Sequence, residues 1–530
     1  MKLITICYDI IIIKANKYIG GTTMRKFETE VQKINHEIMR ELAKLVFKNK
    51  LLDEINELPQ KIIQGDEARY RCCVYKERAI ITERVRLDMG VNPNNIHSNT
   101  FLKDDYEQAC HRLDKPVVQA LEKACDKCPI NRFTVTEACR GCVAHYCMES
   151  CPKDAISFIN RQAYINQEKC IECGKCKNMC PFNAISDVMR PCRSACTVDA
   201  VKVDGDRRIS IDQDKCVSCG ACIEACPFGA IASKSNFISF LEDLTGGEQI
   251  HAMIAPSIAG QFGAKVKVSQ IKAALKNLGM DSVQEVAKGA DVVAYHEAKE
   301  LISSIHEHNF MLSSCCPAFV SLVKNFYSEF TANLSQTVSP MIAMGRSIKQ
   351  KYPGSKVVFI GPCIAKKDEA LEEDVQDGVD YVLTYEEICA LFEGAGVDPS
   401  QCEEFTEEED QNKLVSPFGR CFAKSGGVGE AIKRTVKEIE PDYDIDINVV
   451  KCSGLNECKQ VLEKLKNGKL EADFIEGMGC EEGCIGGPGN LVKPNKSKVM
   501  VEKYGKEAEI ESAVESASSQ IEEPQLFREH

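Results

Sequence analysis

The chain has 530 residues, of which 44% are apolar and 27% are charged, so it has the composition of a folded globular protein with two to four domains. Its net charge of −13 argues against nucleic acid as the main partner but leaves room for an electron carrier that docks on a local basic patch. Thirty cysteines, many of them in C-x-x-C runs, predict metal binding in a reducing compartment rather than disulfides.

The first 23 residues contain an apolar stretch, Ile4–Ile13, which Asp9 interrupts. A membrane span needs roughly 20 apolar residues, and Tyr18–Gly21 is a poor cleavage site for a signal peptide. We therefore interpret residues 1–23 as a non-native extension, with Met24 as the start. No other segment is apolar enough to cross a membrane, so the sequence predicts a cytoplasmic protein without a membrane partner.

Apolar residues recur at helical spacing from Lys26 to about Leu58, which predicts a small helical N-terminal region over residues 24–120. Within it, the basic segment Arg69–Arg78 contains the pair Cys72 and Cys73. The pair indicates either a metal or docking site, or two buried thiols beside a basic surface. Because the sequence offers no further ligand nearby, we favour the two buried thiols.

Four cysteine runs follow, which predict tandem α+β modules of the bacterial ferredoxin type over residues 121–235. In the spacing C-x2-C-x2-C-x3-C-P, three cysteines bind one 4Fe-4S cluster and the fourth ligates the other cluster of a pair. A zinc ribbon lacks the third internal cysteine and the final Cys-Pro. The two complete runs are Cys170, Cys173, Cys176, Cys180-Pro181 and Cys216, Cys219, Cys222, Cys226-Pro227; a stretched run is Cys139, Cys142, Cys147, Cys151-Pro152, and a truncated one is Cys192 and Cys196.

Crossover pairing of these runs predicts three clusters. Their ligand sets are Cys139, Cys142, Cys147 and Cys180; Cys170, Cys173, Cys176 and Cys151; and Cys216, Cys219, Cys222 and Cys196. Cys192 and Cys226 are then left with half a site, and Cys125-x2-Cys128 has the spacing that the truncated run lacks. We therefore hypothesise a fourth cluster on Cys125, Cys128, Cys192 and Cys226. The alternative is that these four cysteines are relics and only three clusters form.

From about residue 249 the pattern changes to helices that alternate with short apolar strands, such as Ala252–Ala255 and Lys356–Ile360, and Gly/Pro turns follow the strands. This alternation predicts an α/β domain over residues 236–495. The tail, residues 496–530, is polar and helix-prone, and is either a packed surface helix or a disordered end.

Three segments of this α/β part resemble the active-site signature of the [FeFe]-hydrogenases. They are Ser313-Ser314-Cys315-Cys316-Pro317-Ala318-Phe319, Gly361-Pro362-Cys363-Ile364-Ala365-Lys366-Lys367 and Glu476-Gly477-Met478-Gly479-Cys480-Glu481-Glu482-Gly483-Cys484-Ile485-Gly486-Gly487. The resemblance, over roughly 249–500, implies a catalytic domain of the hydrogenase large-subunit type. It also implies an H-cluster, in which a 4Fe-4S cubane held by Cys316, Cys363, Cys480 and Cys484 is bridged through Cys484 to a diiron unit carrying CO, cyanide and azadithiolate.

The same resemblance implies roles for residues that are not metal ligands. Lys366 and the run Ala255-Pro256-Ser257 match the family's cyanide contacts, and Met478 matches a methionine that packs on the diiron unit. A buried anionic cyanide needs hydrogen-bond donors. Taken singly, these residues could be a surface lysine, a helix cap and a core filler; their joint placement around the cysteines favours the family roles.

A proton path is also implied, through Cys315, Glu297, Ser335 and Glu300. Cys315 is adjacent to the ligand Cys316, so its thiol is free to be the last donor. Glu297 and Glu300 are three residues apart, which places both carboxylates on one helix face, and Ser335 can bridge them. In isolation such a pair would indicate a solvated helix face.

Three departures from the family pattern suggest a divergent subgroup. Gly361 stands where many members carry Met, which predicts a more open wall of the diiron pocket; Met341 replaces a frequent polar residue; Pro488 interrupts a glycine run. The implied reaction is 2H⁺ + 2e⁻ ⇌ H₂, with protons and H₂ as substrates, ferredoxin or a similar carrier as electron partner, and hydrogenase maturation factors for assembly. The alternatives are a hydrogen sensor of low turnover and a non-catalytic hydrogenase-like iron–sulfur assembly protein.

Overall fold

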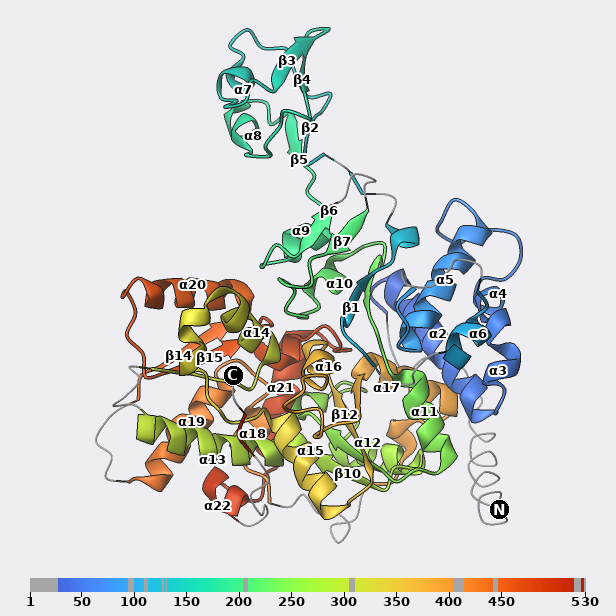
Figure 1. Ribbon diagram of the computed structural model, residues 1–530, viewed down its shortest axis with the longest axis vertical. Helices are drawn as coiled ribbons and strands as arrows, with labels where there is room; N and C mark the ends of the chain where they lie inside the picture. The colour runs from blue at the N-terminus through green and yellow to red at the C-terminus, as the bar shows by residue number, and fades with distance from the viewer. Residues whose placement is uncertain are drawn as a thin grey trace.

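The structure is a computed structural model that describes most of the chain. It covers residues 27–93, 100–108, 113–125, 128–129, 131–203, 208–304, 310–404, 414–441, 447–518 and 526–528, so the predicted extension 1–23 lies outside it. Figure 1 shows a group of N-terminal helices in blue, an arm of short strands and small helices in cyan and green, and a large α/β body in green through red. Among the described residues, no helix is long and apolar enough to cross a membrane.

The N-terminal helices begin with α2 (Glu30–Phe47), where the Thr29 side chain accepts a hydrogen bond from the backbone N–H of Gln32 at 3.2 Å. Helix α2 ends well before the predicted end at Leu58, because Asn49 turns the chain with a φ of 53°. Shorter helices follow: α3 (Leu51–Glu54), α4 (Leu58–Ile62), α5 (Val74–Asp88) and α6 (Leu102–Gln108). Helix α2 packs against α17 (Tyr385–Ala395), which joins this region to the body.

The cysteine pair before α5 differs from its prediction. Cys72 and Cys73 are both exposed, with their sulfur atoms 4.0 Å apart, so the interpretation as buried thiols is wrong. The buried Glu77 carboxylate accepts hydrogen bonds from the backbone N–H groups of Arg69 at 2.8 Å and Arg71 at 2.9 Å. The chain therefore turns around a carboxylate, and this turn holds the two thiols at the surface.

The arm consists of antiparallel strand pairs with one-turn helices between them (Figure 1). The pairs are β2 (Phe133–Val135) with β5 (Ile185–Asp187), β3 (Ile156–Ile159) with β4 (Gln162–Ile165), β6 (Val201–Val203) with β7 (Ile209–Ile211), and β1 (Val118–Ala120) with β8 (Ile231–Ser233). The helices are α7 (Tyr146–Glu149), α8 (Lys175–Met179), α9 (Pro191–Ala195) and α10 (Ala221–Ala225). Because β1 pairs with β8, the two ends of the cysteine-rich region return to one place.

The body contains two parallel sheets, which confirms the predicted α/β class. One sheet has the order β10-β9-β12-β13, with β9 (Ile250–Ile254), β10 (Ser282–Glu285), β12 (Lys356–Gly361) and β13 (Tyr381–Thr384); the other has the order β11-β15-β14, with β11 (Met311–Leu312), β14 (Val449–Ser453) and β15 (Phe474–Met478). The helices around them are α11 (Phe237–Gly246), α12 (Val268–Asn277), α13 (Val286–Ser304), α14 (Pro317–Phe326), α15 (Pro340–Lys351), α16 (Ala365–Glu369), α18 (Pro417–Cys421), α19 (Gly427–Ile439), α20 (Leu455–Lys466), α21 (Pro494–Gly505) and α22 (Ala513–Ser518).

The carboxyl ends of four parallel strands carry the residues of interest. Ala255–Ser257 follow β9, Cys315 and Cys316 follow β11, Cys363 follows β12, and Cys480 follows β15. Ligands of α/β proteins bind at this end of the strands. The topology therefore gathers segments that are far apart in sequence.

The C-terminal tail is packed over its described residues. Helix α21 lies against α18, and α22 lies against α13. Beyond α22, the carbonyl of Leu526 accepts from the backbone N–H of Val338 at 2.7 Å. Of the two alternatives for the tail, the packed one therefore applies to these residues.

Candidate active site and metal centres

Four thiols converge at the strand ends, on Cys316, Cys363, Cys480 and Cys484. Burial raises the pKa of Cys363 to about 12, and the neighbouring thiols of Cys316 and Cys484 contribute to the rise. Burial and neighbouring thiols also raise the pKa of Cys480 and Cys484. Burial and mutual repulsion disfavour the thiolate forms, and a cationic metal group would compensate both effects. The donor set therefore fits an iron–sulfur cubane.

A single metal ion fits these residues less well. Among the described residues, no three or more His, Cys, Asp or Glu side chains are gathered tightly enough to hold one ion. A cubane is larger than an ion, so its ligands stand further apart. The backbone N–H of Gly479 donates to the Cys316 sulfur at 3.3 Å, as N–H groups do to cluster-bound sulfur.

Lys366 lies on α16, one turn after Cys363. Its ammonium donates to the backbone carbonyl of Cys315 at 3.1 Å and to Oε2 of Glu369 at 2.7 Å. Burial lowers the pKa of Lys366, but the neighbouring negative groups, Glu369 foremost, outweigh burial, and the net pKa is raised. Lys366 is therefore held as a cation beside the cysteines.

Ser257 is buried in the turn after β9, and its hydroxyl lies 2.7 Å from that of Tyr385. The Tyr385 hydroxyl also donates to the carbonyl of Ala255 at 3.3 Å, and burial raises the pKa of Tyr385 well above its usual value. Sequence reasoning missed this tyrosine. A signal was present: Thr384 and Glu387 form a capping box that starts α17 directly after β13, at the same sheet edge.

The four residues of the expected proton path form a line of neighbours from Glu300 to Cys315, in which Glu297 and Cys315 interact through charge rather than through a hydrogen bond. The Ser335 hydroxyl donates to Oε2 of Glu300 at 2.7 Å and also contacts Glu297. Burial, with the Glu300 charge adding to it, raises the pKa of Glu297 to about 8. Burial and then the Glu297 charge raise the pKa of Cys315 well above its usual value. Glu300 is partly exposed, so the line runs from the surface to the buried thiol.

Two departures from the family pattern have visible consequences. A Cβ atom on Gly361 would lie 2.4 Å from the Phe359 ring, so the expectation of an open wall here is wrong: the ring of Phe359 fills the space. Pro488 packs against Gly220, where a Cβ would meet the proline at 2.7 Å. Gly220 directly precedes α10, so this contact joins the body to the arm. Met341 is buried in α15, and Met478 is buried in the same apolar cluster as Cys315.

The cysteines of the arm lie beside the partners that crossover pairing assigns to them. Besides burial, the thiols that raise the pKa of Cys147 are Cys142 and Cys180. The thiols that raise the pKa of Cys176 are Cys170, Cys151 and Cys173. Cys139 packs against the apolar cluster that contains Cys147 and Cys176. The thiols that raise the pKa of Cys222 are its assigned partners Cys219, Cys216 and Cys196, together with Cys192 from outside the set. Cys219 in turn lies near Cys316, so the third set adjoins the thiols of the body.

Three of these runs end in the same turn. After Cys151, Cys180 and Cys196, the third residue has a positive φ, and the N–H of the fourth donates to the cysteine sulfur. The third residues are Asp154, Asn183 and Asp199, and the N–H···S distances from Ala155, Ala184 and Ala200 are 3.3, 3.4 and 3.2 Å. Such bonds tune the potentials of iron–sulfur clusters. The arm therefore fits 4Fe-4S groups as well.

Comparisons with known proteins agree with this chemistry. Residues 248–488 match the family described as iron only hydrogenase large subunit, C-terminal domain, and residues 163–186 and 209–232 match the 4Fe-4S binding domain. Iron hydrogenase 1 of Clostridium pasteurianum is 28% identical over 388 residues, which are 64% of this chain and 67% of that protein.

Of two further relatives, one is named as a hydrogenase and the other is not. The periplasmic [Fe] hydrogenase large subunit of Nitratidesulfovibrio vulgaris is 27% identical over 394 residues, 66% of this chain and 89% of that protein. Protein NAR1 of Arabidopsis thaliana is 24% identical over 339 residues, 51% of this chain and 70% of that protein. The chain is an iron-only hydrogenase-like protein with 4Fe-4S binding domains ahead of its large-subunit domain.

Proposed function

We propose that the protein catalyses 2H⁺ + 2e⁻ ⇌ H₂ at an H-cluster. The observation that carries this proposal is the line from Glu300 through Ser335 and Glu297 to Cys315, which ends beside Cys316. A protein that only binds a cubane has no need for a buried proton relay. Cys316, Cys363, Cys480 and Cys484 would hold the cubane, with Cys484 as the bridge.

Each residue of the line has a distinct task. When bound, the H-cluster supplies the electrons and the metal centre at which the H–H bond forms or breaks. A carboxyl with a pKa of about 8, such as Glu297, both accepts and releases protons near neutral pH. Cys315 keeps its proton in the buried site and passes it over the last step. Ser335 connects the two carboxylates.

Three other groups would bind the non-protein ligands of the H-cluster. Lys366 carries the positive charge that an anionic cyanide requires, and the Glu369 carboxylate maintains that charge. The Ser257 hydroxyl is the second candidate donor, and the Tyr385 hydroxyl orients it. Met478 would supply apolar packing against the diiron unit.

Electrons would pass through the accessory 4Fe-4S clusters to or from ferredoxin or a similar carrier, and maturation factors would install the diiron unit. The closeness of Cys219 to Cys316 supports a connection between the third accessory set and the cubane. A cytoplasmic location and the domain limits 24–120, 121–235, 236–495 and 496–530 belong to the same proposal.

Infrared spectroscopy of protein matured with its assembly factors tests the proposal. Bands of metal-bound CO and cyanide are expected, together with hydrogen evolution from a reduced carrier. Full maturation without these bands would refute the enzymatic function. Bands with only trace turnover would favour the hydrogen sensor.

A non-catalytic iron–sulfur protein is the second candidate, because the similarity extends to Protein NAR1 as well as to hydrogenases. Such a protein would bind the cubane and the accessory clusters, but it would show no CO or cyanide bands. Iron analysis together with the infrared spectrum separates the two candidates.

A further inference from the structure

Four cysteines of the arm lie outside the three cluster sets described above. Cys125 follows the 3-10 helix η3 (Glu122–Ala124), and Cys192 lies in α9. Cys128 and Cys226 complete the group. Pairing of β1 with β8 brings the two ends together, with the N–H of Leu121 donating to the carbonyl of Ala230 at 2.8 Å. Only Cys226 falls within the segments that match a 4Fe-4S family.

The four thiols are neighbours. The sulfur of Cys192 lies within electrostatic reach of the sulfur atoms of Cys226, Cys128 and Cys125. Cys192 and Cys226 are themselves buried, and Cys125 packs against the apolar clusters of both. Three sequence segments thus bring four sulfur atoms to one buried point.

Cys226 is followed by the same turn that follows Cys151, Cys180 and Cys196. Gly229, three residues on, has a φ of 57°, and the N–H of Ala230 donates to the Cys226 sulfur at 3.2 Å. The same bond is present at Cys151, Cys180 and Cys196. The local geometry of a cluster ligand is therefore complete at Cys226.

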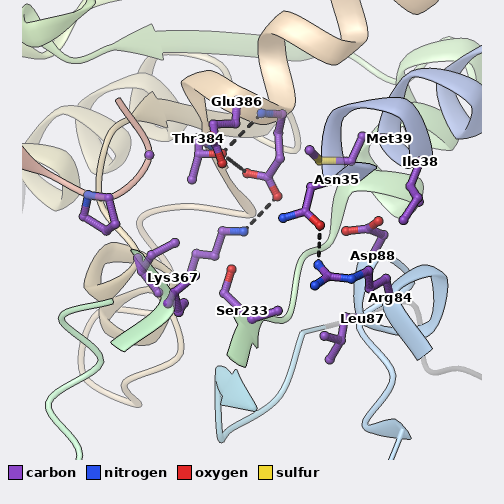
Figure 2. Close-up of a pocket in the computed structure, with 16 residues that line it drawn as sticks. Asn35, Ile38, Met39, Arg84, Leu87, Asp88, Ser233, Lys367, Thr384 and Glu386 are labelled. Atoms are coloured by element: carbon purple, nitrogen blue, oxygen red, sulfur yellow. Dashed lines mark hydrogen bonds and ion pairs between the residues drawn. The ribbon is translucent and has the colours of Figure 1, made fainter. Parts of the chain in front are cut away.

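Two buried arginines flank the group. Nη1 of Arg190 lies 3.8 Å from the Cys125 sulfur, and Arg190 is only 3% exposed. Arg84 is 7% exposed and lies near the Cys226 thiol. Arg84 lines a cavity of about 90 Å³. Figure 2 shows it bonded to Asn35, with Asp88 beside it. Arg84 also bonds the carbonyl of Gly229, three residues after Cys226, and Arg190 bonds the carbonyl of Pro129, next to Cys128. These bonds fix two positive charges beside the four thiols.

We propose that Cys125, Cys128, Cys192 and Cys226 hold a fourth accessory 4Fe-4S cluster, and that Arg84 and Arg190 raise its reduction potential. Positive charge and hydrogen bonds to sulfur stabilise the reduced, more negative cluster. The site depends only on iron–sulfur chemistry and is independent of the hydrogen reaction.

The full-length chain, reconstituted anaerobically with iron and sulfide, provides the first test. The variant Cys128→Ser is expected to lose about four irons per chain and one paramagnetic signal of the reduced protein. The control Cys72→Ser, a surface cysteine, is expected to lose neither. An unchanged iron content in Cys128→Ser would overturn the proposal.

Alkylation of the unmodified iron-loaded protein decides the matter even where a variant fails to fold. Cys125 and Cys128 are partly exposed, as are Cys216 and Cys219 of the third set. All four are expected to resist alkylation until the iron is chelated. Labelling of Cys125 and Cys128 in the loaded protein, with Cys216 and Cys219 protected, would overturn the proposal.

The arginines are tested by a redox titration of the signal that Cys128→Ser abolishes. Arg190→Gln is expected to shift its midpoint to a more negative potential, and Arg190→Lys to retain most of the original value. Arg434→Gln, which removes an exposed arginine paired with Glu438 on α19, is the matched control. An unchanged midpoint in Arg190→Gln would refute the electrostatic role.

Discussion

The Lys366 ammonium and the Glu369 carboxylate lie 2.7 Å apart on one turn of α16. Both side chains are buried, and Arg528, near the C-terminus, reaches Oε1 of Glu369 at 3.8 Å. Lys366 also bonds the carbonyl of Cys315. A network of buried charges thus connects the chain end to the backbone of the expected proton donor, and it fixes the orientation of Lys366 within the site.

Removal of the Glu369 carboxylate should destabilise the protein. Glu369→Gln leaves Lys366 buried without its counterion, which typically costs about 3–5 kcal/mol. Chemical denaturation of the purified chain measures the change. The double variant Lys366→Met/Glu369→Leu should recover most of the loss, because it leaves no unpaired charge on either side chain. A Glu369→Gln variant as stable as the wild type would contradict a structural role for the pair.

The fit between Gly361 and Phe359 gives a second prediction. Gly361→Ala places a methyl group against the Phe359 ring, which should cost about 1–3 kcal/mol through overpacking. The double variant Phe359→Leu/Gly361→Ala should be more stable than Gly361→Ala alone, since the smaller side chain vacates the space. Thermal unfolding of the two variants and the wild type measures this coupling. An equal loss of stability in the single and double variants would show that the Phe359 ring does not occupy the space of the added methyl group.

Short-range spacing predicted the features that depend on a few neighbouring residues. The cysteine runs, the strands near residues 252 and 356, and the shared helix face of Glu297 and Glu300 all belong to this class. Each is determined by local geometry: the reach of a loop around a cluster, or the period of a strand or a helix.

Long-range packing explains what the sequence could not predict. The Phe359 ring fills the space beside Gly361 from two residues away on the same strand. Tyr385 reaches Ser257 across one intervening strand, β12, over a separation of 128 residues. Cys72 and Cys73 stay exposed because Glu77 shapes the turn around backbone N–H groups, which leave no trace in hydropathy.

Cys315 gives the sharpest functional prediction. Cys315→Ala removes the last donor of the proton line but no proposed ligand, so hydrogen evolution should fall by about 10²–10⁴ while iron content stays the same. The control Cys72→Ala, at the surface, should leave hydrogen evolution and iron content unchanged. Gas chromatography and iron analysis on one preparation provide the two readouts. Full turnover in Cys315→Ala would refute the relay.

The pKa of Glu297 leads to a prediction about pH. The carboxyl has a pKa of about 8 in the folded protein, against 4.5 in the unfolded chain. Between these values the folded protein holds a proton that the unfolded chain has released, so stability is greatest below the lower pKa and falls as pH rises toward the higher one. The slope is at most about 1.4 kcal/mol per pH unit for one group.

Glu297→Gln removes this dependence, because an amide does not titrate. The difference in unfolding free energy between the wild type and Glu297→Gln should therefore move in favour of the variant as pH rises from about 5 to about 8. Denaturation curves at several pH values measure it, with Glu430→Gln, at an exposed position, as the control. The same variant should also lose hydrogen evolution at every pH, since its amide neither accepts nor releases a proton. A pH-independent stability difference would mean that Glu297 is ionised in the folded protein and would remove its carboxyl as a proton carrier near neutral pH.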